Sequence, residues 1–571
     1  MKMKKLTLIA AMTIFSVATL PAQQEQTGER DLSRQVEVSK EYAPTPENAA
    51  KLGIQPNMVD TALFRPEFSY SIRPTAWVAG FGVAAINPAQ VDVTARNSAK
   101  PFYVKLGGGY PAQSIFDLYA TSTERGRGHV GVYANHYGQY GKIENDICRQ
   151  AEALMTTNSA GVFGRTRIGR MILGGEIGYD HDIWSRYGQF SVENIPLSSY
   201  GEGRSPMQHY STPRAEVYFG DDFSDLKYLN FRVGAGSNIF SDRYDNAQKE
   251  FNAFAEAGKM FSIHKFALKI EYGGWRGSKH LDKEGNFIFA GGLRYEVATD
   301  RFKLSLGGKY AHDMGDYKIN KGYFLPEAAF MLNLTAGYVV PFATLDSRII
   351  NNSFRSMSRL NPYISPEHIY IPESTREMKL RAGILGNIAS YFSYRLYAGM
   401  ERFYSVPVFA NLYAEGNTSD FVVMKEERLN VLLVGAEFEG RIAGNLSMKA
   451  AASLRDYSAK RFKNAIGRPK FNASLEAKYS YRDRLYIRGG AEVIGERYFA
   501  YTTKTGGKTQ LNSTDSTLPL TVDITLGADY RVSSSFTVFV DGRNLANRKL
   551  YHFSHYPDQG IAVNAGVKLT F

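Results

Sequence analysis

The C-terminal strand constrains the fold most, because its pattern can be counted back from the last residue. Apolar residues occupy every second position there: Ile561, Val563, Ala565, Val567, Leu569 and Phe571. Small or polar residues lie between them. This period of two predicts a β-strand with one apolar and one polar face. A soluble sheet can end in the same way, so the pattern leaves two hypotheses open: a soluble sheet, or a barrel whose apolar face meets lipid.

The same alternation recurs along the chain from Phe102 onward. Clear examples are residues 102–107, 287–297, 302–310, 471–481 and 522–530. The segments run about 9 to 13 residues, near the length that a tilted strand needs to cross a bilayer. Many apolar rows begin or end with Phe or Tyr, and the chain has 35 Phe and 37 Tyr, as aromatic girdles at the two membrane interfaces require. The sequence therefore predicts an all-β, transmembrane antiparallel β-barrel of about 22 strands over residues 102–571.

Connections between these segments fall into two classes. Short turns are predicted after the even strands, for example at Ile388-Ala389-Ser390 and Arg482-Asp483. Long loops are predicted after most odd strands, at residues 182–207, 347–376, 405–427 and 498–517. Short periplasmic turns and long external loops are typical of such barrels. The first connection, near Pro111, is an exception because it is external but short.

The N-terminus indicates export. Three lysines (Lys2, Lys4 and Lys5) precede an apolar stretch from Leu6 to Leu20, and Ala22 follows. A basic start, an apolar region of this length and a small residue at the cleavage point predict a signal peptide over residues 1–22. No later stretch reaches the ~20 apolar residues of a membrane-spanning helix. Export without a spanning helix, together with amphipathic strands, predicts an integral outer-membrane protein.

Residues 23–101 differ from the rest of the chain. They hold seven prolines, which favour extended backbone over a packed fold. We expect an extended, Pro-rich periplasmic segment. Within it, Val36, Val38 and Lys40 belong to an alternating stretch that could add as a strand to a partner's sheet. The alternative is a short extended stretch without a partner.

The formal charge of +12 does not indicate nucleic-acid binding, because the basic residues are spread over strands and loops. The single cysteine, Cys148, cannot form an internal disulfide. Several basic residues fall on the predicted lumen face: Lys105, Arg232, Lys303, Lys309, Lys449, Arg455, Lys478 and Lys568. They either bias a pore toward anions or pair with carboxylates on neighbouring strands, and the sequence leaves both hypotheses open.

Two groups of residues have metal-ligand character. Asp180-His181-Asp182 lies at a strand end, but three consecutive residues of an extended strand cannot converge on one ion. His552, His555 and Asp558 lie in the last external loop, where solvated side chains are the simpler interpretation. No P-loop, zinc-protease motif, G-x-S-x-G elbow or calcium loop occurs. We therefore predict neither an enzyme nor a bound metal or cofactor.

Short motifs near the C-terminus resemble a known family. Asn544-Leu545-Ala546-Asn547, then Tyr551, Tyr556-Pro557 and Gly560 before the aromatic last strand resemble the end of TonB-dependent receptor barrels. The resemblance is closer to a short, plug-lacking subset, through Val38 to Pro44, Tyr103 to Tyr110 and Asn361-Pro362-Tyr363. Gln35 to Lys40 also resembles a degenerate TonB box. The plug domain of those receptors is longer than residues 23–101, so the resemblance does not imply TonB-driven uptake.

The resemblance implies partners and a function. Val567, Leu569 and Phe571 are expected to form the signal for the barrel assembly machinery, and outer-membrane lipids surround the barrel. TonB-type or other periplasmic proteins and surface lipoproteins are further expected partners. The expected function is a pore or transport protein for a small solute, either passive or gated by a partner. The alternative is a scaffold barrel that binds lipoproteins or periplasmic partners. An unfilled barrel of this width would leak, so we expect it to be filled, with loop 347–376 as the best internal candidate.

Overall fold

The computed structural model describes residues 100–122, 128–145, 150–188, 207–279, 281, 284–315, 319–335, 337–388, 391–413, 420–505 and 508–571. The predicted signal peptide, the segment with Val36, Val38 and Lys40, and Cys148 lie outside the described residues. The same is true of the expectation that residues 23–101 are extended and lack a plug.

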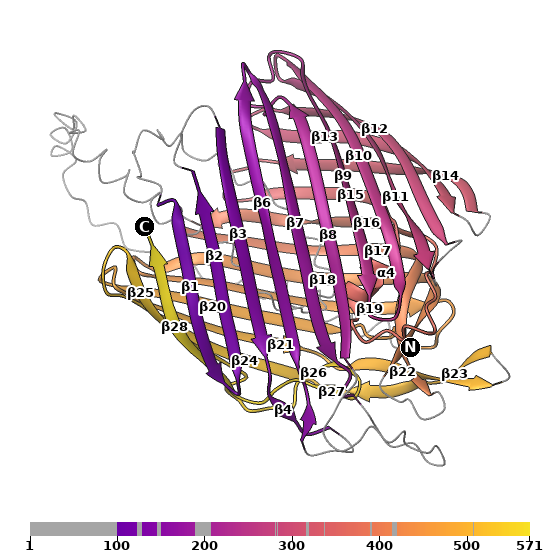
Figure 1. The fold of residues 1–571 in the computed structure, drawn as a ribbon. Helices are drawn as coiled ribbons and strands as arrows, with labels where there is room; N and C mark the ends of the chain where they lie inside the picture. Colours follow the sequence, from indigo (N-terminus) through magenta and orange to yellow (C-terminus); the bar gives the residue numbers. More distant parts are fainter. Residues whose placement is uncertain are drawn as a thin grey trace, which may run out of the picture. The chain divides into compact units, whose positions relative to one another are not determined.

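Twenty-two antiparallel strands form a closed barrel (Figure 1), which confirms the predicted fold class and strand number. They are β1 (Phe102–Tyr110), β2 (Gln113–Thr121), β3 (Gly128–Gln139), β6 (Met155–Ile168), β7 (Met171–Ser185), β8 (Met207–Gly220), β9 (Asn230–Asp242), β10 (Asn246–Phe261), β11 (His264–Lys279), β12 (Gly285–Ala298), β13 (Phe302–Gly315), β14 (Ile319–Leu332), β15 (Val340–Ile350), β16 (Thr375–Ile388), β17 (Phe392–Tyr413), β18 (Phe421–Ala443), β19 (Leu446–Ala459), β20 (Phe471–Tyr481), β21 (Leu485–Ile494), β24 (Thr521–Arg531), β25 (Phe536–Arg543) and β28 (Ala562–Thr570).

The remaining elements lie in connections between barrel strands. They are β4 (Lys142–Ile143), β5 (Ala151–Glu152), α4 (Phe354–Leu360), β22 (Arg497–Thr505), β23 (Lys508–Leu518), β26 (Tyr551–Phe553) and β27 (Tyr556–Pro557). Within the described part of the chain, no helix is long and apolar enough to cross a membrane.

The first and last strands close the barrel. β1 and β28 pair antiparallel through eight residue pairs, from Tyr103↔Thr570 to Tyr110↔Val563. β28 pairs on its other side with β25. This pairing removes the two outer edges of the sheet, whose backbone groups would find no hydrogen-bond partner in lipid.

The two ends of the barrel differ in their connections. Two residues join β10 to β11, where Ser262 has a φ of 57°, and two join β18 to β19. Residues 186–206 and 351–374 are long connections at the opposite end. In outer-membrane barrels the short turns face the periplasm and the long connections face outward, so we name the end with the long connections external. The β1–β2 connection is external and has only two residues, Pro111 and Ala112, as the sequence predicts.

Two predicted loops are largely strand. β17 and β18 continue past the barrel as a hairpin, so most of residues 405–427 pair as β-structure instead of forming the expected loop. Likewise, the expected loop 498–517 forms the β22–β23 hairpin, and β22 pairs in parallel with the end of β17. The strands continue beyond the barrel wall because every second side chain there is apolar and buried. Val408, Ala410 and Leu412 belong to one buried cluster.

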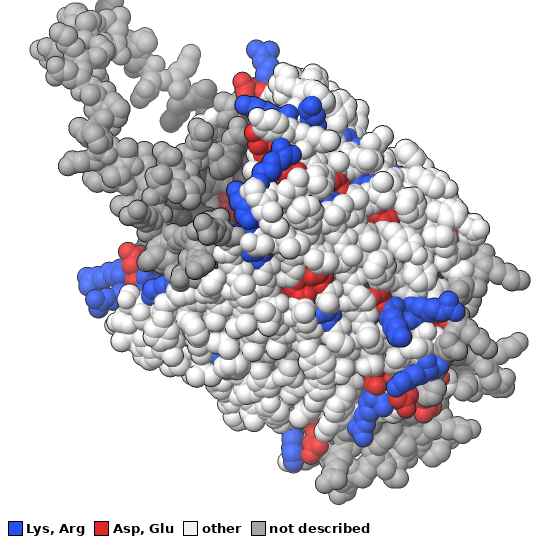
Figure 2. All heavy atoms as spheres, turned by 45° about the horizontal axis from the view of Figure 1, so that its top comes forward, with Lys and Arg blue, Asp and Glu red and all other residues white. Residues whose placement is uncertain are grey.

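The outer wall is apolar. Ile177, Leu293 and Phe324 are 71%, 68% and 71% exposed, although each is a large apolar side chain. Figure 2 shows a broad wall of uncharged residues, with most Lys, Arg, Asp and Glu toward its margins. Apolar side chains in such numbers on a closed barrel indicate a lipid-facing band. The alternation predicted for residues 302–310 is confirmed, since Leu306 is 47% exposed whereas Lys309 forms an ion pair with Glu327.

Candidate functional site

Residues 351–374, which we name the mouth loop, lie at the external end of the barrel and are mostly buried. It leaves β15, passes through α4 and returns at β16, and Figure 1 shows α4 within the outline of the barrel. Phe354, Met357 and Ile364 are at most 2% exposed. Asn361, Pro362 and Tyr363, which the sequence singled out, are also buried. The expectation that this loop is packed rather than solvated is therefore confirmed.

Local hydrogen bonds shape the mouth loop. Ser353 caps α4: its Oγ accepts the backbone N–H of Ser356 at 3.1 Å, and the Ser356 Oγ accepts the backbone N–H of Ser353 at 2.8 Å. This reciprocal pair satisfies donors that a helix start leaves free. At the other end, the backbone N–H of Asn361 donates to the carbonyl of Met357 at 2.9 Å. Two caps allow a helix of seven residues to form in a loop.

Contacts across the lumen hold the mouth loop in place. Arg355 forms an ion pair with Glu250 of β10 at 2.8 Å. The hydroxyl of Tyr210 on β8 donates to the carbonyl of Pro362 at 2.9 Å. β10 and β8 lie five and seven strands from β15 along the wall. The mouth loop therefore crosses the lumen instead of lying along its own edge of the barrel.

An aromatic cluster forms the centre of this closure. The ring of Tyr363 stacks on Tyr556, with centroids 3.7 Å apart and an interplanar angle of 22°. The rings of Trp184, Tyr187 and Phe553 meet Tyr363 edge-on. Burial raises the pKa of Tyr187 and Tyr556 well above the ordinary value, so both stay neutral. Segments far apart in the sequence thus share one apolar core at the mouth.

A buried ion pair lies beside the aromatic cluster. Arg186 and Asp420 approach to 3.3 Å, and their side chains are only 4% and 2% exposed. The Arg186 guanidinium also donates to the carbonyl of Ile364 in the mouth loop at 3.3 Å. Burial acts to lower the pKa of Arg186, but the Asp420 carboxylate raises it, and the net pKa is raised. The pair therefore remains charged and ties three connections together.

A second connection, residues 460–470, is held by Glu426. The backbone N–H groups of Lys460, Arg461 and Phe462 donate to its carboxylate at 3.0, 2.9 and 3.0 Å. Glu426 is 2% exposed and Phe462 is 4% exposed. This role could not be predicted from the sequence, because a lone acidic residue in an alternating strand belongs to no motif.

Five of the eight predicted basic residues form ion pairs on the barrel wall. These pairs are Lys568–Asp529 (2.8 Å), Lys309–Glu327 (2.8 Å), Lys449–Glu439 (2.8 Å), Lys303–Glu296 (3.1 Å) and Arg232–Glu256 (3.6 Å). Lys105 lies 4.8 Å from the ring centroid of Phe539. Arg455 donates to the side-chain oxygen of Asn472 at 2.9 Å, and Lys478 lies opposite Arg488 on the next strand. Carboxylates on the wall balance the positive charge of five of these eight residues. A preference of the pore for anions therefore stays a prediction.

The three residues of the expected assembly signal lie in the closing seam. Val567 and Leu569 are paired with β1 on one side and β25 on the other. The backbone N–H of Phe571 donates to the carbonyl of Phe102 at 3.0 Å, and the Phe571 carbonyl accepts the Phe102 N–H at 3.2 Å. Phe571 is 57% exposed. Its recognition by assembly machinery stays a prediction.

The residues with metal-ligand character do not converge. Asp180 binds Arg214 at 2.6 Å, while the ring of His181 stacks on Tyr179. Among the described residues, no three His, Cys, Asp or Glu side chains form a group that could hold a metal ion.

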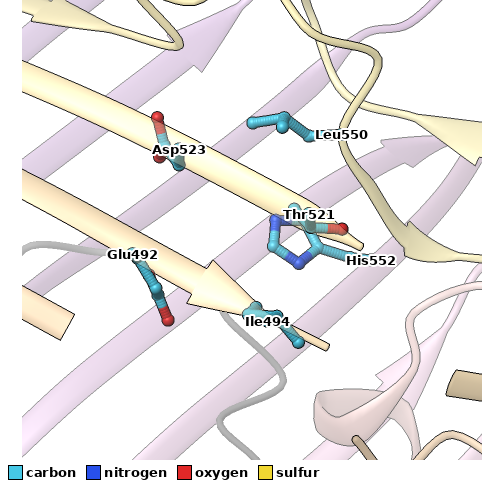
Figure 3. Close-up of a pocket in the computed structure, with 6 residues that line it drawn as sticks. All are labelled: Glu492, Ile494, Thr521, Asp523, Leu550 and His552. Carbon is cyan, nitrogen blue, oxygen red and sulfur yellow. The ribbon is translucent and has the colours of Figure 1, made fainter. Parts of the chain in front are cut away.

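In the last external connection, His552 contacts Asp558 at 2.8 Å and His555 contacts Tyr501 at 3.0 Å, so the two histidines have different partners. A small cavity beside His552 has a volume of about 20 Å³ (Figure 3). It is lined by Glu492, Ile494, Thr521, Asp523, Leu550 and His552. One water needs about 10–15 Å³, so the cavity has room for a single water and is too small for a solute.

Neither a family profile nor a curated protein matches the sequence, whereas many solved structures match the fold. The ferric enterobactin receptor PfeA of Pseudomonas aeruginosa aligns over 83% of this chain and 80% of its own, with 10% identity and a TM-score of 0.61. The siderophore receptor PirA of Acinetobacter baumannii aligns over 82% and 80%, with 10% identity and a TM-score of 0.60. The outer-membrane ferripyoverdine receptor of Pseudomonas aeruginosa aligns over 83% and 72%, with 12% identity and a TM-score of 0.58.

The chain has the barrel fold of the siderophore receptors. This confirms the resemblance to TonB-dependent receptor barrels that the short motifs indicated. The fold and the apolar outer band agree with the prediction of an integral outer-membrane protein. The three solved structures are named as receptors.

Proposed function

We propose that this receptor-like barrel is a transport protein for a small solute, whose pore is closed at the external mouth and opened by a partner. The observation that carries the proposal is the mouth loop, which crosses the lumen and shares a buried aromatic core with other connections. The buried side chains of this core are at most 7% exposed, so they form a packed barrier. The barrel is thus closed in its ground state and not a passive open pore.

Partner gating follows from the strength of the closure. Opening the mouth separates a stacked tyrosine pair and a buried Arg186–Asp420 ion pair, and each resists spontaneous opening. Binding of a partner supplies the free energy needed to shift such an equilibrium. TonB-type periplasmic proteins, acting on the segment with Val36, Val38 and Lys40, and surface lipoproteins at the mouth are the two partner classes we propose.

The solute class rests on the lumen lining and on the matched structures. The matched structures include receptors named for ferric enterobactin and ferripyoverdine. The predicted lumen lining is basic, which favours an anionic solute, but five of its members are already paired with carboxylates.

Single-channel conductance in planar bilayers tests the proposal with four forms of the protein. They are the full mature chain, a chain without residues 23–99, a chain with residues 353–373 replaced by a Gly-Ser linker, and the chain with both changes. We expect the first two to be silent and a large conductance to require removal of the mouth loop. Ser262→Gly in a periplasmic turn is the control, because it leaves the mouth untouched.

The alternative function is a scaffold barrel that holds lipoproteins or periplasmic partners. The external β22–β23 hairpin, which pairs with the extended β17, favours it by enlarging the surface outside the membrane. Silence of all four forms, together with co-purification of stable partners, would rule out transport and support the scaffold function.

A further inference from the structure

The wall of the barrel is incompletely hydrogen-bonded between β14 and β15. These strands share only four residue pairs, which involve Ala328 to Met331 on β14. The flanking ladders are complete: β13 and β14 share 14 pairs, and β15 and β16 share 11. Residues 319–327 of β14 and 346–350 of β15 have no mutual ladder in the described structure. We name this external half the β14–β15 seam.

The seam lies at the depth of the lipid. Phe324 is 71% exposed on the outer face of β14, within the apolar band. Lipid offers no hydrogen bonds to an open strand edge, so barrels pair their strands throughout the membrane. Pro326 lies in the part of β14 that has no ladder to β15. Proline has no backbone N–H, which suits a position at a strand edge.

Side chains close the seam in place of backbone bonds. Ile349 of β15 and Tyr323 of β14 pack against a small cluster that includes Ala311 and Leu325 on the inner face of β13 and β14. The guanidinium of Arg376 on β16 lies 4.2 Å from the ring centroid of Tyr323 and 4.5 Å from that of Tyr404 on β17. The seam can therefore open without breaking a main-chain ladder.

The two sides of the seam differ in chemistry. Outside, Phe324 faces lipid. Inside, Glu327 forms ion pairs with Arg294 and with Lys309, the latter at 2.8 Å. A molecule in the open seam would meet hydrocarbon on one side and charged groups on the other.

We propose that the β14–β15 seam is a lateral portal for an amphiphile. Its polar end enters or leaves the lumen while its apolar chain stays in the outward-facing leaflet. The proposal rests on the proposed transport function, in that it takes the lumen as the passage. It adds a substrate class, a membrane amphiphile, and an exit that leaves the mouth loop closed. Arg376, between two tyrosine rings, is the residue that holds the portal shut.

Reaction with a membrane-dissolved reagent tests the portal. The reagent is a phosphatidylethanolamine with a maleimide headgroup, mixed into phosphatidylcholine vesicles that hold the barrel. In a Cys148→Ser background, Leu325→Cys places a thiol on the inner face at the seam. Phe324→Cys is the lipid-facing reference. Ala451→Cys, on β19 where both ladders are formed, is the reference away from the seam. Rates are normalised to each thiol's rate in unfolded protein.

We expect Leu325→Cys to react clearly faster than Ala451→Cys. Arg376→Ala should raise the Leu325→Cys rate about fivefold, since it removes two cation–π contacts, and Arg376→Lys should restore the low rate. Arg402→Ala, on β17, is the matched control and should change nothing. Equal rates at Leu325→Cys and Ala451→Cys, with or without Arg376→Ala, would overturn the portal. The labelling experiment does not measure conductance. Equal labelling rates would therefore not contradict the transport proposal, and silent channels would not change the meaning of the labelling rates.

Discussion

At the scale of single residues, what matters is which face of the wall a side chain occupies. Two residues of β13 that lie three positions apart have opposite surroundings. Leu306 meets lipid, and Lys309 meets Glu327. In lipid a charge has no solvent and no partner, whereas in the lumen it has both. Substitutions of similar size therefore have very different costs on the two faces.

Leu306→Arg should destabilise the folded barrel by about 2–4 kcal/mol, because it puts a charge on the apolar outer face. Urea unfolding in lipid vesicles, followed by tryptophan fluorescence, measures this change. Lys309→Ser is the control and should be mild, since Glu327 keeps its contact with Arg294. Equal losses for both variants would contradict the assigned faces.

Asp420→Ala should destabilise the closed mouth by about 3–5 kcal/mol, because it leaves the buried Arg186 without its counter-charge. We expect flickering single-channel currents from a barrel whose wall remains folded. Lys449→Ala removes an ion pair that is more than half exposed and serves as the comparison. If both variants are silent, the ion pair does not hold the mouth shut.

At the scale of elements, alternation predicted the barrel strands well and the external hairpins poorly. An apolar residue at every second position indicates a strand with one apolar and one polar face, and most strands of a lipid-embedded barrel have these two faces. β17 and β18 extend beyond the bilayer with the same period, so sequence alone could not tell where the membrane ends. The mouth loop could be singled out because Phe354 and Tyr363 are unusual in a solvated loop. Glu426 and the Arg186–Asp420 pair could not, because their partners are distant in sequence.

Deleting Phe571 should sharply reduce the amount of inserted barrel. The deletion removes two backbone hydrogen bonds to Phe102 and the exposed aromatic end of β28. Quantification of folded protein in outer-membrane fractions measures the effect, with Phe571→Tyr as the conservative control. Unchanged folded levels after the deletion would show that this residue is not part of an assembly signal.

At the scale of the whole molecule, the barrel should behave as a membrane protein sealed at one end. We expect it in the outer-membrane fraction, with gel migration that changes on heating because the closed sheet resists detergent until it is boiled. The number of strands, the topology and the apolar band were all readable from the sequence. The β14–β15 seam was not, because only the pairing register of the two strands shows the gap.

The pairing of β1 with β28 gives the wall an all-or-none character. Residues paired between β1 and β28 are more than 450 positions apart in the chain, so none of these pairs can form until β28 has been added. A chain that stops anywhere before β28 presents two bare edges to a solvent that cannot hydrate them. Such a fragment has no stable inserted form, however well its own hairpins fold. Because the barrel closes only when β28 pairs with β1, an incomplete chain cannot form a closed wall.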